Sequence, residues 1–212
     1  DANVDADPNT SQGIFVFTST PPPASAAVGN RIRVTGTVTE FTPSSNLNQL
    51  SITEIVSVSS ILEMSTGNPL PAPVVLTAAD FGATANPGTA EKYEGMRVSV
   101  PVSRAVSGSD GNISESSANA STTGVFHVVL PGVDRPFREP GLAATDTVTV
   151  PATKTNVPRF DTNPERLRVD TDALEGTTTL TLDAGAIVRE AEGVLDVDAG
   201  NAALLTGPGL VL

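Results

Sequence analysis

Apolar and polar residues alternate in many short stretches of this chain. In residues 31–41, Ile32, Val34 and Val38 fall on one parity, and arginines and threonines fall on the other. This two-residue period is typical of a β-strand with one buried face. Further strands are predicted at residues 14–18, 50–58, 74–76, 96–100, 125–130, 166–170, 177–182, 186–190 and 193–198. The pattern therefore predicts an all-β protein.

The strand pattern breaks in two long stretches. Residues 106–124 are rich in serine, asparagine and glycine, which favours a loop or linker. A second loop is expected at about 131–165, and one short helical turn is expected around 90–94. Because each half begins with a short apolar strand, we expect two barrel-like β domains, at 1–105 and 125–212.

Composition narrows the possible functions. The 212 residues include 24 acidic and 12 basic side chains, for a net charge of −12. A chain this acidic gains no general attraction for phosphate backbones, so nucleic-acid binding would need a local basic patch. The absence of cysteine excludes disulfides and zinc-ribbon sites. No apolar run approaches the roughly 20 residues of a membrane helix, so no membrane span is expected. We also find no signal peptide.

Catalytic constellations are absent from the sequence. His127 is the single histidine, and it lies within an apolar strand pattern without the partners of a catalytic triad. The carboxylate pairs Asp170/Asp172 and Asp196/Asp198 share a strand face through their two-residue spacing alone, which is typical of a solvated face. The sequence therefore predicts a protein that is not an enzyme.

The N-terminus carries the best candidate for a metal site. Oxygen-bearing side chains stand at every second position, at Asp1, Asn3, Asp5, Asp7 and Asn9. Ca²⁺ binds six to eight such oxygens, so this loop is predicted as a calcium site, although it departs from the EF-hand pattern. A second acidic set comprises Asp196, Asp198 and Asn201. The alternative is that these residues only initiate turns by bonding their own backbone.

Basic side chains are concentrated in one part of the chain. The candidates for nucleic-acid binding are Arg135, Arg138, Arg159, Arg166 and Arg168. If they converge, they can follow the backbone of a single strand, as basic grooves of OB-folds do. Neighbouring carboxylates such as Glu139 and Glu165 favour the alternative, in which these arginines form ion pairs that order a long loop.

Several segments together resemble one protein family. They are residues 5–17, 28–41, 70–74, 91–98, 129–133, 135–141 and 158–170. In this order they are similar to the OB-like region of secreted bacterial endonucleases, which precedes a catalytic domain of the endonuclease/exonuclease/phosphatase type. The resemblance implies two OB-like, Greek-key β-barrel units and export from a bacterium. The family has a further strand before the Asp/Asn-Pro loop, so the first unit is expected to lack its opening strand. None of the family's catalytic residues matches a position in this chain.

Two functions follow as expectations. The first is a non-catalytic extracellular module that resembles the accessory region of these nucleases and binds single-stranded nucleic acid. The alternative is an extracellular structural subunit that assembles into a filament, because a sheet lacking a strand leaves an edge that a neighbouring copy can complete. The apolar run at 203–212 is expected to dock either in its own sheet or on that neighbour.

Overall fold

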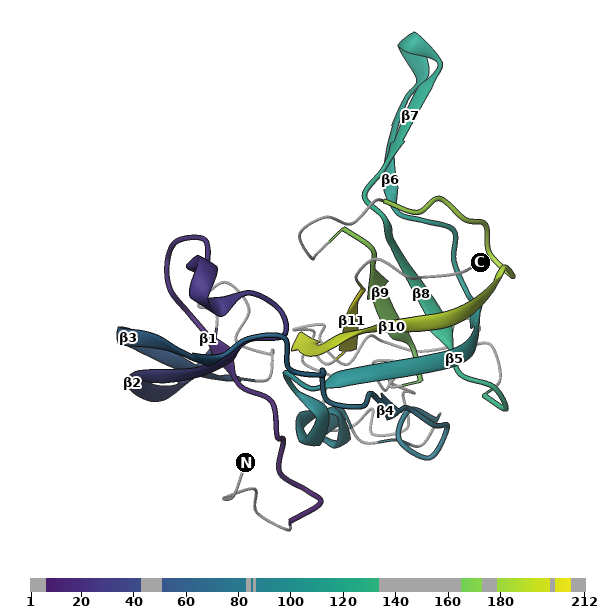
Figure 1. The fold of residues 1–212 in the computed structure, drawn as a ribbon. Coiled ribbons are helices and arrows are strands. Elements are labelled where there is room, and N and C mark those ends of the chain that lie inside the picture. Colours follow the sequence, from purple (N-terminus) through teal and green to yellow (C-terminus); the bar gives the residue numbers. More distant parts are fainter. Residues whose placement is uncertain are drawn as a thin grey trace, which may run out of the picture.

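The computed structural model describes residues 7–42, 51–82, 85, 87–133, 165–172, 179–198 and 201–206. The regular elements in these ranges are β-strands and short 3₁₀ helices, so the predicted all-β class is confirmed. The strands form a small sheet, a larger sheet and a projecting hairpin, which Figure 1 shows as separate parts of the molecule.

The small sheet contains three strands in the order β1-β3-β2. Strand β2 (Arg31–Phe41) matches the predicted range, and it pairs antiparallel with β3 (Ile52–Ser65). Strand β1 (Phe15–Val16) pairs parallel with β3. A short 3₁₀ helix, η1 (Ala24–Ala26), lies between β1 and β2 in the chain. Strand β3 continues beyond the predicted end at residue 58, because its second half still has a partner in β2.

The larger sheet contains six strands. They are β4 (Val74–Val75), β5 (Arg97–Ala105), β8 (Val125–Val129), β9 (Leu167–Asp170), β10 (Ile187–Asp198) and β11 (Asn201–Thr206). Their order is β10-β11-β9-β8-β5-β4, and β10 also pairs with β5. The β4–β5 and β9–β11 pairs are parallel, and the others are antiparallel.

Strand β10 is one continuous strand where the sequence pattern predicts two, at 186–190 and 193–198. Its first part pairs with β5 as far as Val194↔Arg97, and from Gly193 onward it pairs with β11. Glu190 has a φ of +55° and no ladder partner, opposite Pro101 of β5. Since proline cannot donate a ladder hydrogen bond, the irregularity falls where the ladder is already interrupted. The chain therefore bends at Glu190 without ending the strand.

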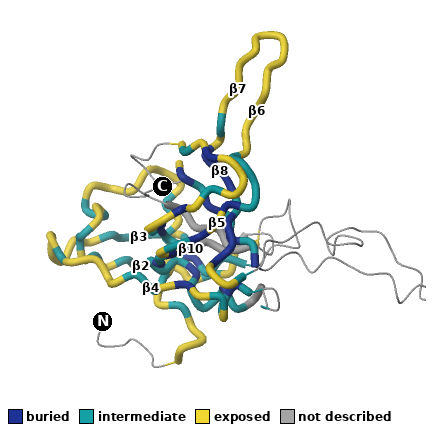
Figure 2. The backbone as a smooth tube through the Cα atoms, turned by 90° about the vertical axis from the view of Figure 1, so that its right-hand side faces the viewer, coloured by how far each residue is buried: buried dark blue, intermediate teal, exposed yellow. Residues whose placement is uncertain are grey.

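Residues 111–122 form a hairpin where the sequence indicates a loop or linker. Strand β6 (Gly111–Ser114) pairs antiparallel with β7 (Asn119–Thr122), and η3 (Glu115–Ser117) forms the tip. The hairpin projects from the larger sheet and is exposed along nearly its whole length (Figures 1 and 2). A Cβ at Gly111 would lie 2.0 Å from the carbonyl oxygen of Ser121, so this close pairing requires glycine.

The hydrophobic core belongs to the larger sheet and the segments packed on it. Its most deeply buried large side chains are Val98, Val100, Phe126, Val128, Leu130, Leu167, Val169, Val188 and Leu195. Figure 2 shows the buried residues concentrated in this sheet. In residues 7–42 and 51–65, by contrast, the one buried side chain is Glu54. The small sheet thus has no buried apolar centre within the described residues.

The two sheets meet at the segment before β5. The 3₁₀ helix η2 (Pro87–Tyr93) leads into Glu94 and Gly95. A Cβ at Gly13 would lie 2.2 Å from the carbonyl carbon of Gly95, so the two backbones touch directly. The amide of Thr53 donates to Oε2 of Glu94 at 3.2 Å, and the Ser11 hydroxyl donates to the Glu94 carbonyl. These contacts anchor the N-terminal segment and β3 to the larger sheet.

The predicted division at 106–124 stays a prediction. Strands β4 and β5, which the predicted first domain includes, pair within the larger sheet. Residues 203–206 of the apolar C-terminal run lie in β11, between β10 and β9, so this part docks in its own sheet; residues 207–212 lie outside the described residues. In the part of the chain that the structure describes, no helix has the length and hydrophobicity to span a membrane.

Candidate ligand-binding face

The outward face of β8 and β9 brings several predicted residues together. Along these strands, Phe126, Val128, Leu167 and Val169 point into the core. Because side chains alternate along a strand, residues of the opposite parity face away from the core. His127 lies opposite Arg168 in the ladder, and Val125 lies opposite Asp170, so one face carries both the histidine and the arginine.

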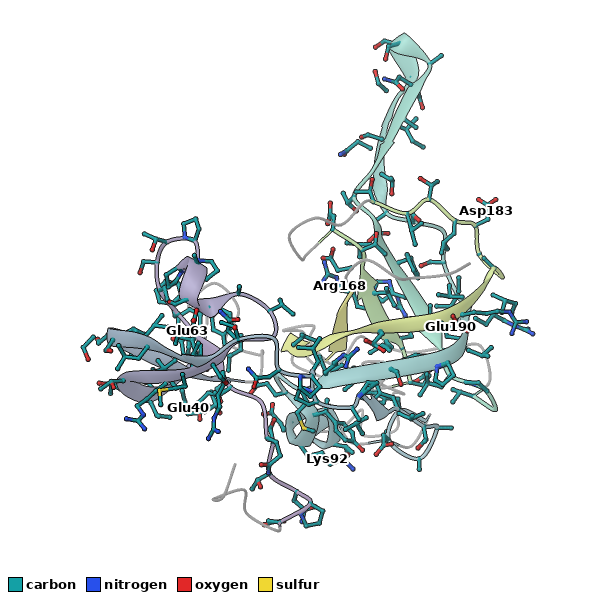
Figure 3. The ribbon with its side chains drawn as sticks, viewed as in Figure 1. Glu40, Glu63, Lys92, Arg168, Asp183 and Glu190 are labelled. Carbon is teal, nitrogen blue, oxygen red and sulfur yellow. The ribbon has the colours of Figure 1, made fainter. Side chains whose placement is uncertain are left out.

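Two of the five predicted arginines lie at this face. Arg168, labelled beside β9 in Figure 3, donates from Nη2 to Oδ2 of Asp170 at 2.8 Å. Arg166 stands one residue before β9, and its buried Nε has no hydrogen-bond partner among the described residues. The remaining candidates, Arg135, Arg138 and Arg159, lie outside the described residues. Convergence of all five thus stays a prediction.

The imidazole of His127 is held in its neutral form. Burial is the main cause that lowers the pKa of His127 from its ordinary value of 6.5 to about 4. The positive charges of Arg166 and Arg168 lower this pKa further, and the carboxylate of Asp110 opposes them. At neutral pH the side chain can therefore offer one donor and one acceptor and no charge.

A polar cleft of about 760 Å³ adjoins this face at the base of the hairpin. We call it the hairpin cleft. It is lined by Asp110, Gly111, Asn112, Thr122, Thr123, Val125, Arg168, Asp170 and Asp172. The hydroxyls of Thr122 and Thr123 donate to the carbonyl of Asp110 at 3.1 and 3.2 Å, which fixes the base of the hairpin.

The hairpin side of this cleft is not predicted from the sequence. Its residues fall in 106–124, where serine and asparagine hide the strand pattern. The glycines indicate where the hairpin begins and ends, because Gly111 is its first residue and Gly124 follows it in the sequence. Gly124 has a φ of +71°, and a Cβ there would lie 2.5 Å from Oγ1 of Thr171. A turn with this geometry returns the chain to β8.

The carboxylates of the hairpin cleft interact with each other. The amide of Asp172 donates to Oδ1 of Asp170 at 3.4 Å. A side-chain hydrogen bond with Asp170 is the main cause that raises the pKa of Asp172, with desolvation and the Asp170 charge adding to it. With one guanidinium and three carboxylates, the cleft offers many hydrogen-bonding groups to a polar ligand.

The predicted calcium loop is only partly described. Oδ1 of Asp7 accepts from the backbone amide and the side-chain amide of Asn9, at 2.9 and 3.0 Å. This bonding is typical of an Asx turn. Asp1, Asn3 and Asp5 lie outside the described residues. In the second set, Asp198 and Asn201 are ladder partners at the adjoining ends of β10 and β11, but the side chains of Asp196, Asp198 and Asn201 lie outside the described residues. Within the described residues, no three or more acidic or histidine side chains are grouped as a metal site. The calcium site stays a prediction.

A second polar cluster joins η2 to the segment that follows β4. The carboxylate of Asp80 accepts hydrogen bonds from Lys92 at 2.9 Å, Tyr93 at 2.8 Å and Thr77 at 2.9 Å. Burial alone would raise the pKa of Asp80, but these three hydrogen bonds outweigh it and lower the pKa. The ammonium of Lys92 also lies 4.7 Å from the centre of the Tyr93 ring. These contacts fix η2 to the segment around Asp80.

Comparisons with known proteins assign no relative. No protein-family model matches the chain, and searches of curated proteins and of solved structures find no match either. The resemblance to the OB-like region of secreted endonucleases therefore remains an expectation from the sequence.

Proposed function

We propose that this protein is a non-catalytic extracellular module that binds single-stranded nucleic acid across β8 and β9. The observation that carries this proposal is the pairing series β5–β8–β9–β11–β10, with β10 pairing back to β5 and a parallel β9–β11 pair. The five-stranded OB-fold has the same series, counted as first, second, third, fifth and fourth strand. In that fold, the face of the second and third strands binds oligonucleotides and oligosaccharides.

The groups at this face support a ligand with a phosphate backbone and polar edges. Arg166 and Arg168 supply positive charge, and the hairpin cleft supplies amide and hydroxyl groups. Its three carboxylates oppose a phosphate, so the backbone of the ligand is expected to follow the arginines and its polar edges to face the cleft. The projecting hairpin joins the first and second strands of the series, where OB-folds place a ligand-contacting loop. Among the described residues that line the hairpin cleft, none is aromatic, so the proposal relies on charge and polar contacts and predicts binding that depends strongly on salt.

Single-residue variants test this proposal. Fluorescence anisotropy with a labelled oligo-dT at low salt should show several-fold weaker binding for Arg166→Ala and Arg168→Ala, because each removes one cation from the face. Asp170→Asn should bind more tightly, because it removes the carboxylate that competes for Arg168. Arg33→Ala, on exposed β2, is the matched control and should leave binding unchanged. Binding that is absent at low salt, or equal in all four variants, would contradict the proposal.

The alternative proposal is self-assembly through the small sheet, and one observation favours it. Within the described residues, β2 pairs only with β3, and no apolar side chain of this sheet is buried. Val38 in β2 is 63% exposed. A strand edge with these properties is a template for a strand from another copy.

Sedimentation velocity over a range of concentrations distinguishes the two proposals. Self-assembly predicts that the wild type forms larger species as its concentration rises and that Val38→Lys remains monomeric, because an edge lysine blocks strand pairing. Val28→Lys is the control, since Val28 is 86% exposed but lies outside the strands. A wild type that stays monomeric throughout would refute assembly and leave the nucleic-acid proposal intact.

A further inference from the structure

A second cleft, of about 850 Å³, lies beside β3 in the small sheet. We call it the β3 cleft. One wall is the segment that follows β1, including Phe17, Ser19 and Pro21, and the other includes Ser57, Val58 and Ile61 of β3. None of the residues lining the β3 cleft also lines the hairpin cleft, so the two sites are independent.

The β1–β3 ladder ends at the mouth of this cleft. Phe15 pairs with Glu54 and Val16 pairs with Ile55, and the amide of Phe17 then donates to the carbonyl of Ile55 at 3.0 Å. Beyond Ile55, no backbone hydrogen bond from the described residues reaches this edge of β3, although β3 continues to Ser65. Within the described residues, this part of the β3 edge therefore has no strand partner, which is the condition for pairing with an added strand.

The chain leaves this edge through unusual backbone conformations. Ser19 has a φ of +58° and Ser57 a φ of +50°, and both residues line the β3 cleft. Left-handed conformations are rare for residues other than glycine and often mark binding sites. From Ser19 onward, no described residue before β2 pairs with β3. Pro21, Pro23 and Ser25 instead line the cleft opposite β3, and η1 lies beside that strand.

The chemistry of the β3 cleft defines what fits it. Phe17 and Phe41 line it and are 48% and 47% exposed, which leaves aromatic surface for apolar side chains. Glu54 is its one charged lining residue and is only 6% exposed. Because Glu54 lies in the part of β3 that pairs with β1, the negative charge is at one end of the open edge.

We propose that the β3 cleft binds an extended peptide segment that continues the position of β1 along β3. The backbone of the peptide would pair with the free edge, its apolar side chains would contact Phe17 and Phe41, and a basic group at one end would approach Glu54. A polypeptide fits better than a small molecule, because only a strand repeats its donors and acceptors with the period of the edge. This proposal does not depend on nucleic-acid binding at β8 and β9.

Selection from a phage-displayed library of random decapeptides tests the proposal. The enriched peptides should alternate apolar with small polar residues and carry lysine or arginine at one end. In fluorescence anisotropy, Phe17→Ser should weaken binding of the selected peptide at least fivefold. Glu54→Gln should also weaken binding of this peptide, and its effect should be smaller for a peptide whose basic residue is replaced by alanine. The same peptide methylated at alternate backbone nitrogens should lose binding, because it cannot donate to β3.

The matched control is Phe15→Ser, since Phe15 lies two residues before Phe17 and is 52% exposed, but does not line the cleft. Circular dichroism confirms that each variant is folded. The proposal is overturned if selection on the wild-type protein enriches no more peptides than selection on the Phe17→Ser variant. It is also overturned if Phe15→Ser weakens peptide binding as much as Phe17→Ser does, or if the methylated peptide binds fully. If the peptide is displaced as the protein concentration rises, a second copy of the chain occupies the β3 cleft. That outcome would also overturn the proposal of a peptide ligand.

Discussion

At the scale of single residues, His127 shows how burial and charge combine. Its position within an apolar strand predicts an ordinary strand residue, and the structure places it in a half-buried row beside Arg168. The sequence alone does not predict the neighbours of His127, because Asp110 comes from a segment before β8 in the chain and Arg166 from a segment after it. The lowered pKa therefore follows from tertiary structure and not from the local pattern.

This pKa predicts a pH dependence of stability. The unfolded chain takes up a proton on His127 near pH 6.5, whereas the folded chain takes it up only near pH 4. The unfolded state thus binds more protons in this interval, so the free energy of unfolding falls as the pH drops from 6.5 to 4. His127→Gln cannot be protonated and should lose less stability over the same interval. Urea unfolding of both proteins at pH 7, 5.5 and 4.5 measures this, and parallel curves would contradict it.

At the scale of elements, the sequence pattern predicts strands well where one face is apolar. The strand at 31–41 is confirmed over its exact range, because its alternation is long and the pairing with β3 continues past the irregularity at Gly36. The hairpin at 111–122 was missed, since its serines and asparagines have no core to face and its pairing depends on close contact at Gly111. The two predicted strands at 186–190 and 193–198 form one, because β5 and β11 hold both parts of β10.

The candidate site was predictable to a similar degree. Arg166 and Arg168 are predicted as site residues because arginine is frequent in this part of the sequence. The hairpin cleft was not, because Asp110 and Asp172 meet only through the pairing of β8 with β9 and the return of the chain at Gly124. Strand order is set by contacts between distant residues, and the alternation within each strand does not encode it.

At the scale of the whole molecule, one close backbone contact connects the N-terminal segment to the larger sheet. The Gly13→Ala substitution places a methyl group where the carbonyl carbon of Gly95 already lies. We expect it to lower the free energy of unfolding by about 1–3 kcal/mol, as overpacking does. Gly108→Ala is the control, because the nearest atom would be 3.4 Å away, and it should change stability by less than about 0.5 kcal/mol. Equal effects in urea unfolding would show that the Gly13 contact does not anchor the segment.

The pairing of β10 with β5 also has a consequence for synthesis on the ribosome. Arg97 of β5 pairs with Val194, so β5 emerges long before its partner has been translated. At roughly 5–20 residues per second, this delay is on the order of 5 to 20 seconds. The strands of the small sheet, which end at Ser65, are complete during that time. The nascent chain therefore carries a finished small sheet beside a β5 whose edge toward β10 is still open, and this is the stage at which a chaperone has an apolar strand edge to protect.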